Sequence, residues 1–179
     1  MSRIGRMPIT IPSNVEVKLE DNVVVVKGPL GTLSRTIDNR ISLDIKDGVI
    51  TLSRANDEKE VKAKHGLYRA LIANMVKGVT EGFAKHLMFK GVGYKLSKNG
   101  NKLVMDIGYS HPKTFEEVEG ITIEVVANDE VAVKGIDNEL VGKIAAQIRS
   151  IRPVEPYHAY GIRYKDEVVI RKVSKSGKK

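Results

Sequence analysis

Planar cations and aromatic rings gather in one short segment near the end of the chain. The sequence RSIRPVEPYHAYGIRY, residues 149–164, holds three arginines and three of the chain's six tyrosines. Guanidinium groups bind phosphate oxygens through paired hydrogen bonds and stack on bases, and tyrosine rings stack on bases splayed out of a folded RNA. Pro153 and Pro156 disfavour a helix, and Gly161 permits a turn. We therefore expect an RNA-binding loop in this segment.

The candidate RNA-binding residues extend from this segment into the basic tail. His111 joins them because Pro112 fixes the loop that carries its ring. The candidates are Arg149, Arg152, Tyr157, His158, Tyr160, Arg163, Tyr164, Lys165, Arg171, Lys172, Lys175, Lys178, Lys179 and His111. Folded RNA is favoured over duplex DNA because the sequence has no recognition helix or zinc finger. A competing interpretation is that the rings of Tyr157 and Tyr164 anchor the loop to the domain core.

The positive charge is concentrated in the same region. The chain carries a net charge of +8, and from Lys143 to the end ten basic residues face three acidic ones. Most of the excess charge therefore lies in the last fifth of the chain, which is typical of a surface that binds a polyanion. The alternative is a solvated tail that keeps the protein soluble.

The sequence contains no convincing set of residues for enzymatic chemistry or for metal binding. The chain has no cysteine, which excludes disulfides and thiolate sites and fits a reducing compartment. No histidine has metal-site spacing, and the four positions are His65, His86, His111 and His158. Three nearby acids resemble a solvated run: Glu116, Glu117 and Glu119. We expect no catalytic residues, no metal, no cofactor and no small-molecule substrate.

The N-terminus and the apolar runs indicate a cytoplasmic protein with no membrane partner. The N-terminal sequence MSRIGRMPITIPS contains no apolar run of the kind found in signal peptides. The longest aliphatic run is the four valines at 23–26, far short of the roughly 20 residues that span a bilayer.

The first part of the chain alternates apolar and polar residues before a helical stripe begins. Strands are predicted over 15–19, 23–28, 31–37, 41–45 and 49–54. Asp47-Gly48 is a strong hairpin signal. A helix follows over 58–79, and its predicted apolar face is Leu67, Leu71, Ile72, Met75, Val76 and Val79.

The pattern then restarts. The sequence predicts a hairpin of 86–96 with 102–109 and a second hairpin of 121–127 with 130–135. Gly91-Val92-Gly93 lacks the third glycine of a dinucleotide site, so we interpret these glycines as a bulge or a close backbone approach within a strand. A helix follows over 137–151, and its predicted apolar face is Leu140, Ile144, Ala145 and Ile148.

The two parts of the chain resemble each other, which indicates a duplication. VEVKLEDNVVVVKG aligns with ITIEVVANDEVAVKG, and three residues of each helix face match at a constant offset of 73. We predict an α+β fold of two tandem duplicated domains, each an antiparallel sheet with a helix packed on one face. The predicted domains are 1–82, a protein-facing or peripheral brace, and 83–179, the main RNA-binding domain.

Six blocks of the sequence resemble the bacterial large-subunit ribosomal protein six family. They are MSRIG, VKGPLG (26–31), HGLYRALIANMVKGV (65–79), GVGY (91–94), GYSHP (108–112) and IRSIRP (148–153), in the order of that family and across nearly the whole chain. The resemblance implies a duplicated α+β fold without catalysis. It also implies binding to 23S rRNA near the sarcin–ricin loop and the base of the stalk that serves translation factors, beside neighbouring large-subunit proteins.

The chain departs from this family in the candidate loop. The family's signature there is Tyr-Lys-Gly-Lys-Gly followed by Ile-Arg-Tyr, whereas residues 157–164 read YHAYGIRY. Two lysines have thus become His158 and Tyr160, and a glycine has become Ala159. We hypothesise that stacking by the two rings replaces part of the lysines' attraction for phosphate.

Two other functions stay open at this point. A free-standing module could bind peptides at its sheet edges, in which case deleting 165–179 would leave partner binding intact. An enzyme would need a polar pocket that the sequence does not reveal.

Overall fold

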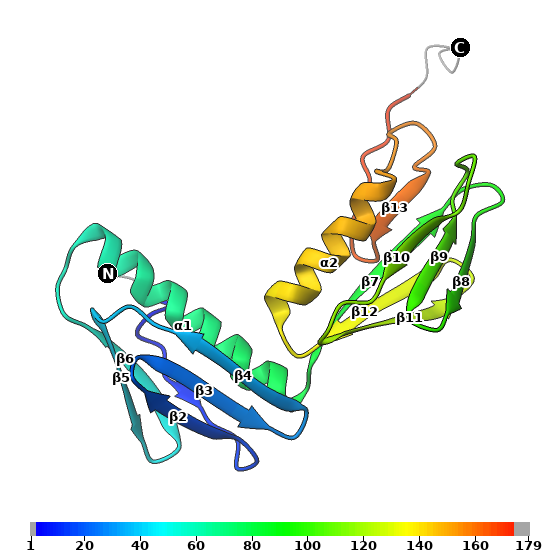
Figure 1. Ribbon diagram of the computed structural model, residues 1–179. Coiled ribbons are helices and arrows are strands. Elements are labelled where there is room, and N and C mark those ends of the chain that lie inside the picture. The colour runs from blue at the N-terminus through cyan, green and yellow to red at the C-terminus, as the bar shows by residue number, and fades with distance from the viewer. Residues whose placement is uncertain (1–2, 174–179) are drawn as a thin grey trace. The chain divides into compact units, whose positions relative to one another are not determined.

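The structure, a computed structural model, describes residues 3–173 and divides into two compact units. Unit 1 runs to Gly82 and also includes Ile136–Asn138. Unit 2 comprises Phe83–Gly135 and the chain from Glu139 onward. Figure 1 shows the order of helices and strands within each unit.

The described part of unit 1 folds into two three-stranded antiparallel sheets and one helix. One sheet has the order β2-β3-β4 and the other β1-β6-β5. The bounds are β1 Ile9–Thr10, β2 Glu16–Glu20, β3 Val23–Gly28, β4 Gly31–Thr36, β5 Ile41–Lys46, β6 Val49–Arg54 and α1 Lys59–Thr80. The predicted hairpin turn is confirmed, since Asp47 and Gly48 have φ values of 50° and 73° and join β5 to β6.

The buried stripe of α1 differs from the predicted one at its N-terminal end. Ile72 is buried as predicted, but the stripe continues through Val61 and His65. Leu67 is 52% exposed, so its assignment to the core is wrong. Residues two positions apart in a helix point in directions about 200° apart, which places Leu67 on the side opposite His65.

Unit 2 repeats this architecture and adds a strand. Its sheets have the orders β10-β9-β8 and β11-β12-β7-β13, with all named strands antiparallel. The bounds are β7 Phe83–Lys90, β8 Lys95–Asn99, β9 Lys102–Asp106, β10 Lys113–Glu116, β11 Ile121–Ala127, β12 Glu130–Gly135, α2 Asn138–Ile151 and β13 Gly161–Tyr164.

The predicted strand over 86–96 is two strands that belong to different sheets. A turn at 91–94 separates β7 from β8, and Gly93 adopts a left-handed φ of 74° there. A Cβ on Gly91 would overlap the ring of Tyr94, so the predicted close approach is real but occurs at a turn rather than within a strand. Glycine is required at both positions because a side chain would be strained or would clash.

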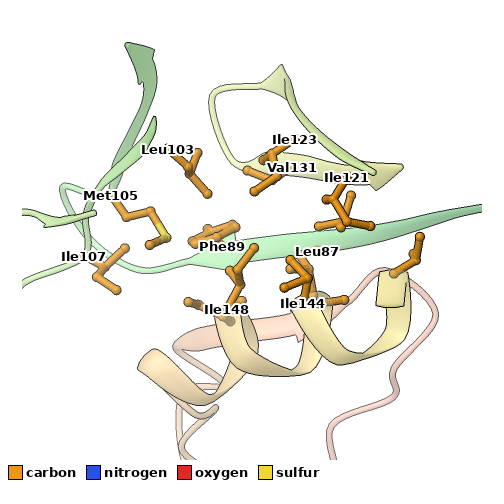
Figure 2. Packing of buried hydrophobic residues seen from close by; sticks show 14 residues of the cluster. Leu87, Phe89, Leu103, Met105, Ile107, Ile121, Ile123, Val131, Ile144 and Ile148 are labelled. Carbon is orange, nitrogen blue, oxygen red and sulfur yellow. The ribbon is translucent and has the colours of Figure 1, made fainter. Parts of the chain in front are cut away.

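The core of unit 2 lies between the four-stranded sheet and α2. In Figure 2, Leu87 and Phe89 of β7 lie next to Ile144 and Ile148 of α2. The second sheet contributes further buried side chains to the same cluster, including Met105. The predicted α2 face is confirmed for Ile144, Ala145 and Ile148, whereas Leu140 is only partly buried.

The duplication is confirmed, but the strands correspond differently from the sequence alignment. β1 pairs with β6 and β6 with β5, just as β7 pairs with β12 and β12 with β11. The sheet β2-β3-β4 likewise matches β8-β9-β10. Aligning β2–β3 with β11–β12 was therefore wrong, because β5–β6 is the hairpin that precedes α1. Within the described residues, β13 has no counterpart in unit 1.

Candidate nucleic-acid interface

Between α2 and β13 the chain forms a loop, residues 152–160, here called the tip loop. The Glu155 carboxylate accepts hydrogen bonds from the backbone N–H groups of Tyr157 at 2.8 Å, His158 at 2.6 Å and Tyr160 at 3.3 Å. Burial would raise the pKa of Glu155, but these hydrogen bonds outweigh it, and the pKa lies below its ordinary value. The carboxylate thus organises the backbone of the loop.

Two rings of the tip loop form a stacked pair. The ring centroids of His158 and Tyr160 lie 5.4 Å apart with an angle of 23° between their planes. Ala159 between them is buried and has a left-handed φ of 59°. Tyr157 is 51% and Tyr160 37% exposed, so both present ring surface to solvent. Part of the surface of all three rings is therefore available to a stacking partner.

Arg149 and Tyr164 are held on the α2 side of the sheet. Arg149 donates from Nε and Nη2 to the two carboxylate oxygens of Glu167 at 2.9 and 2.5 Å. Its guanidinium carbon lies 5.4 Å from the centre of the Tyr164 ring. That ring packs against the core of unit 2. Anchoring by a tyrosine is thus confirmed for Tyr164, while the Tyr157 ring is half exposed.

Arg152 lies between two tyrosine rings, a contact that sequence reasoning missed. Its guanidinium carbon is 5.6 Å from the ring centre of Tyr94 and 5.2 Å from that of Tyr109. Nη1 of Arg152 donates to the Ile107 carbonyl oxygen at 2.5 Å. The Tyr109 hydroxyl donates to the Ile151 carbonyl oxygen at 2.8 Å. These contacts join the end of α2 to the loops that follow β7 and β9.

Lys165 is paired with a buried acid on the other side of the sheet. Its Nζ lies 2.8 and 3.1 Å from the two carboxylate oxygens of Glu130. Nδ1 of His86 is 2.7 Å from the same carboxylate, which gives His86 a structural role. Lys165 first and His86 second hold the pKa of Glu130 below its ordinary value. The pair ties the segment after β13 to β12 and β7.

The remaining candidates differ in their surroundings. Arg163 donates from Nη1 to the Glu167 carbonyl oxygen at 3.0 Å. The backbone N–H of Lys172 donates to the Pro156 carbonyl oxygen at 2.9 Å and so returns the chain to the tip loop. The side chains of Arg171, Lys172 and His111 are exposed. Three candidates lie outside the described residues: Lys175, Lys178 and Lys179.

The expectation of a solvated acidic run is wrong at Glu117. Its carboxylate accepts hydrogen bonds from the Ile123 backbone N–H at 2.5 Å and from Lys98 Nζ at 2.7 Å. Burial raises the pKa of Glu117, but these donors outweigh it and the net shift is downward. Glu116, in contrast, pairs with Lys102 at the surface.

The structure thus separates the candidates into three places. The tip loop carries the exposed rings, the α2 side holds Arg149 and Tyr164, and the opposite side of the sheet holds Arg163 and Lys165, because neighbouring residues of a strand face opposite ways. The acids that organise them went unrecognised in the sequence. Glu130 and Glu167 carry no local signal, whereas Glu155 could have been recognised as a side chain that caps nearby amides.

The charges of unit 1 are largely compensated within that unit. Asp38 accepts hydrogen bonds from Arg40 and Lys64, and Arg40 also bonds Glu60. Arg40 first and Lys64 second hold the pKa of Asp38 far below its ordinary value. Residues 3–173 contain no cluster of side chains suited to a metal ion and no helix that is long and apolar enough to cross a membrane.

Comparison with known proteins accounts for the repeated architecture. Residues 11–82 and 90–165 match the family described as Ribosomal protein L6. The chain belongs to this family. It is 50% identical to "Large ribosomal subunit protein uL6" of Natranaerobius thermophilus over 178 residues, which cover 99% of this chain and all of the relative.

Two further relatives match over their full length. Proteins of the same name from Dictyoglomus thermophilum and Thermoanaerobacter sp. are 52% and 53% identical over 180 residues, with 100% of both chains covered. Ribosomal protein L6 chains are structural, non-enzymatic constituents, so this chain is a ribosomal protein and not an enzyme.

Proposed function

We propose that this member of the L6 family is a structural constituent of the cytoplasmic large ribosomal subunit that binds 23S rRNA. Unit 2 makes the main contact through the tip loop and the segment after β13. The proposed binding region on the rRNA lies near the sarcin–ricin loop and the base of the factor-binding stalk, a location that the family resemblance supports. The observation that carries the proposal is an internally organised loop with exposed rings beside cations.

A preformed loop of this kind favours binding of folded RNA. Because Glu155 already fixes the backbone between Tyr157 and Tyr160, little conformational entropy is lost when RNA binds. Stacking on the outer faces of the His158–Tyr160 pair accepts any base. Two arginines that bond neutral carbonyl oxygens, Arg152 and Arg163, supply attraction for the RNA backbone, which depends on salt rather than on sequence.

The test is the affinity of the full chain for a 23S rRNA fragment that contains the sarcin–ricin loop. Tyr160→Ala should weaken binding by about 5–150-fold, since stacking contributes about 1–3 kcal/mol per base. Tyr160→Lys should not restore it. Val126→Ala is the matched control, because Val126 is also exposed but lies on β11, at the other edge of the sheet from β13. A neutral Tyr160→Ala together with tighter binding by Tyr160→Lys would refute the stacking hypothesis.

Salt dependence tests the wider proposal. If six to ten phosphates are neutralised, affinity should fall about 10³–10⁵-fold between 50 and 200 mM salt. A flat response would contradict RNA binding through cations. Deleting 165–179 would also remove the Lys165–Glu130 and Arg149–Glu167 pairs and so damage the fold. Ending the chain at Val173 is the cleaner test of the tail, and we expect weaker binding.

Unit 1 is proposed as a brace that contacts neighbouring proteins. Three apolar side chains, Ile4, Met7 and Leu67, are each more than half exposed. Arg69 holds the N-terminal arm by donating to the carbonyl oxygens of Met7 and Pro8 at 3.1 and 3.2 Å. Exposed apolar side chains on a fixed backbone favour a protein contact. A photo-crosslinker at Leu67 should capture protein in assembled subunits; capture of RNA alone would overturn this assignment.

A further inference from the structure

A cationic pocket lies beside the tip loop, and the contacts described above involve only some of its lining residues. Its volume is about 320 Å³, and four basic side chains contribute to its walls together with two acids and three apolar residues. The lining consists of Lys90, Ala159, Arg163, Lys165, Asp166, Glu167, Val168, Val169 and Arg171. We call this the β13 pocket.

The strand register brings the cations to one side of the sheet. Lys90, the last residue of β7, is opposite Gly161, and Arg163 is opposite Met88. Residues two apart on a strand face the same way, so the side chains of Lys90 and Arg163 share one face of the sheet. Arg171 reaches the pocket from the segment after β13, which the Lys172–Pro156 hydrogen bond holds against the tip loop.

The ionic partners within the pocket are unevenly distributed. Glu167 is neutralised by Arg149, and Lys165 by Glu130. Arg163 donates to a neutral carbonyl oxygen and forms no ion pair within the described residues, although its charge also acts on the Glu167 carboxylate. Within residues 3–173, the side chains of Lys90 and Arg171 form no hydrogen bond and no ion pair. Two cations without an ion-pair partner, and a third that a carbonyl oxygen fixes, therefore line one small hollow. Their combined positive charge exceeds the single negative charge of Asp166.

We propose that the β13 pocket holds one backbone phosphate of RNA, which Lys90 and Arg171 bind together. The ribose of that nucleotide packs on Ala159 and Val169, the buried and half-buried apolar residues of the lining. The volume is at the lower end of small-ligand pockets, about 300–1,000 Å³, so it suits one nucleotide rather than a longer segment. This inference rests on the proposed function and adds a contact at Lys90, outside the segment that the sequence singled out.

A double-mutant cycle tests the shared phosphate. Lys90→Met and Arg171→Met remove the charges but keep the apolar stems, and each should weaken binding of the 23S rRNA fragment about tenfold. If both cations hold one phosphate, the double variant should bind about as weakly as the weaker single variant. The slope of log affinity against log salt should then become shallower in the double variant by about 0.7–0.9. This is the change expected for the loss of one phosphate contact and not of two.

Lys59→Met is the matched control, because Lys59 is an exposed lysine at the start of α1 in unit 1. Single effects that multiply in the double variant would overturn the shared phosphate. Effects no larger than that of Lys59→Met would overturn the pocket altogether. Both results are distinct from failure of the proposed function, in which the unaltered protein itself would show no salt-dependent binding.

Titration with inorganic phosphate at constant ionic strength distinguishes RNA from a free anion as the ligand of the β13 pocket. Under the proposal, the NMR signals of Lys90 and Arg171 shift with the RNA fragment but not with micromolar phosphate. Saturation by micromolar phosphate would assign the pocket to a free anion and overturn the RNA contact.

Discussion

Replacing Gly161 by alanine should destabilise unit 2 strongly. Gly161 has a φ of 135°, and an added Cβ would lie 2.6 Å from the Pro153 carbonyl oxygen and 2.7 Å from the Val154 Cα. These backbone atoms cannot move aside easily, because the Ile162 N–H donates to the Arg152 carbonyl oxygen at 2.9 Å. The strained backbone costs about 1–3 kcal/mol and the overlap about 1–3 kcal/mol more. We expect a total loss of about 2–6 kcal/mol.

Gly100→Ala is the matched control for this substitution. Gly100 is also in unit 2 and has a left-handed φ of 60°, but no atom lies within 4 Å of its added Cβ. This variant should lose about 1–2 kcal/mol of stability, which is the cost of the left-handed conformation alone. The assay is urea unfolding of the full chain, with the free energies of the two variants compared. Equal losses in both variants would refute the claim that backbone crowding at Gly161 adds to the cost of its positive φ.

Two further predictions concern stability. Glu167→Gln should cost about 1 kcal/mol at pH 7, and in urea unfolding the difference should shrink as the pH falls below the ordinary glutamate pKa and vanish only below the lowered pKa of folded Glu167. The sign follows because Arg149 lowers the pKa of Glu167, so the stability that the pair contributes is present above the pKa of the unfolded chain and is lost as the pH falls; a constant difference would contradict this. Ile72→Ala should cost about 2–5 kcal/mol, whereas Leu67→Ala should change stability by less than about 0.5 kcal/mol in thermal unfolding, and similar losses would contradict the observed helix face.

Local patterns predicted most of the secondary structure because the signals are short in range. Two hairpins, which turn at Asp47-Gly48 and at Asn128-Asp129, were recognisable from the alternation of their strands and from their turn residues. Two errors arose where a local pattern is ambiguous. The alternation through 86–96 continues across the Gly91–Gly93 turn, so periodicity could not show that the chain changes sheet. Leu67 fits the helical spacing of the predicted apolar face. However, the face that the helix buries includes His65, and Leu67 lies outside it.

The candidate site was predictable in composition but not in geometry. The rings and cations are contiguous in sequence, so their presence could be read directly. Their partners are distant: Arg149 bonds an acid 18 residues away, and Arg152 bonds a carbonyl group 45 residues away. Such pairs depend on how sheet and helix pack, which single-residue patterns do not specify. Lys90 was overlooked for the same reason, because only the register with β13 brings it beside the tip loop.

Intramolecular partners change what each cation can contribute to RNA binding. Arg149 and Lys165 bond carboxylates, so their charges are cancelled within a few ångströms. Arg152 and Arg163 bond carbonyl oxygens instead, which fixes their direction without an ion pair to either guanidinium in the part of the chain that the structure describes. At physiological salt, charges are screened over about 8 Å, so a fixed, uncompensated cation acts on a phosphate only at close range. In the proposed interface, the acids of unit 2 therefore position the side chains, and the arginines held by neutral acceptors are the cations that would attract the RNA backbone.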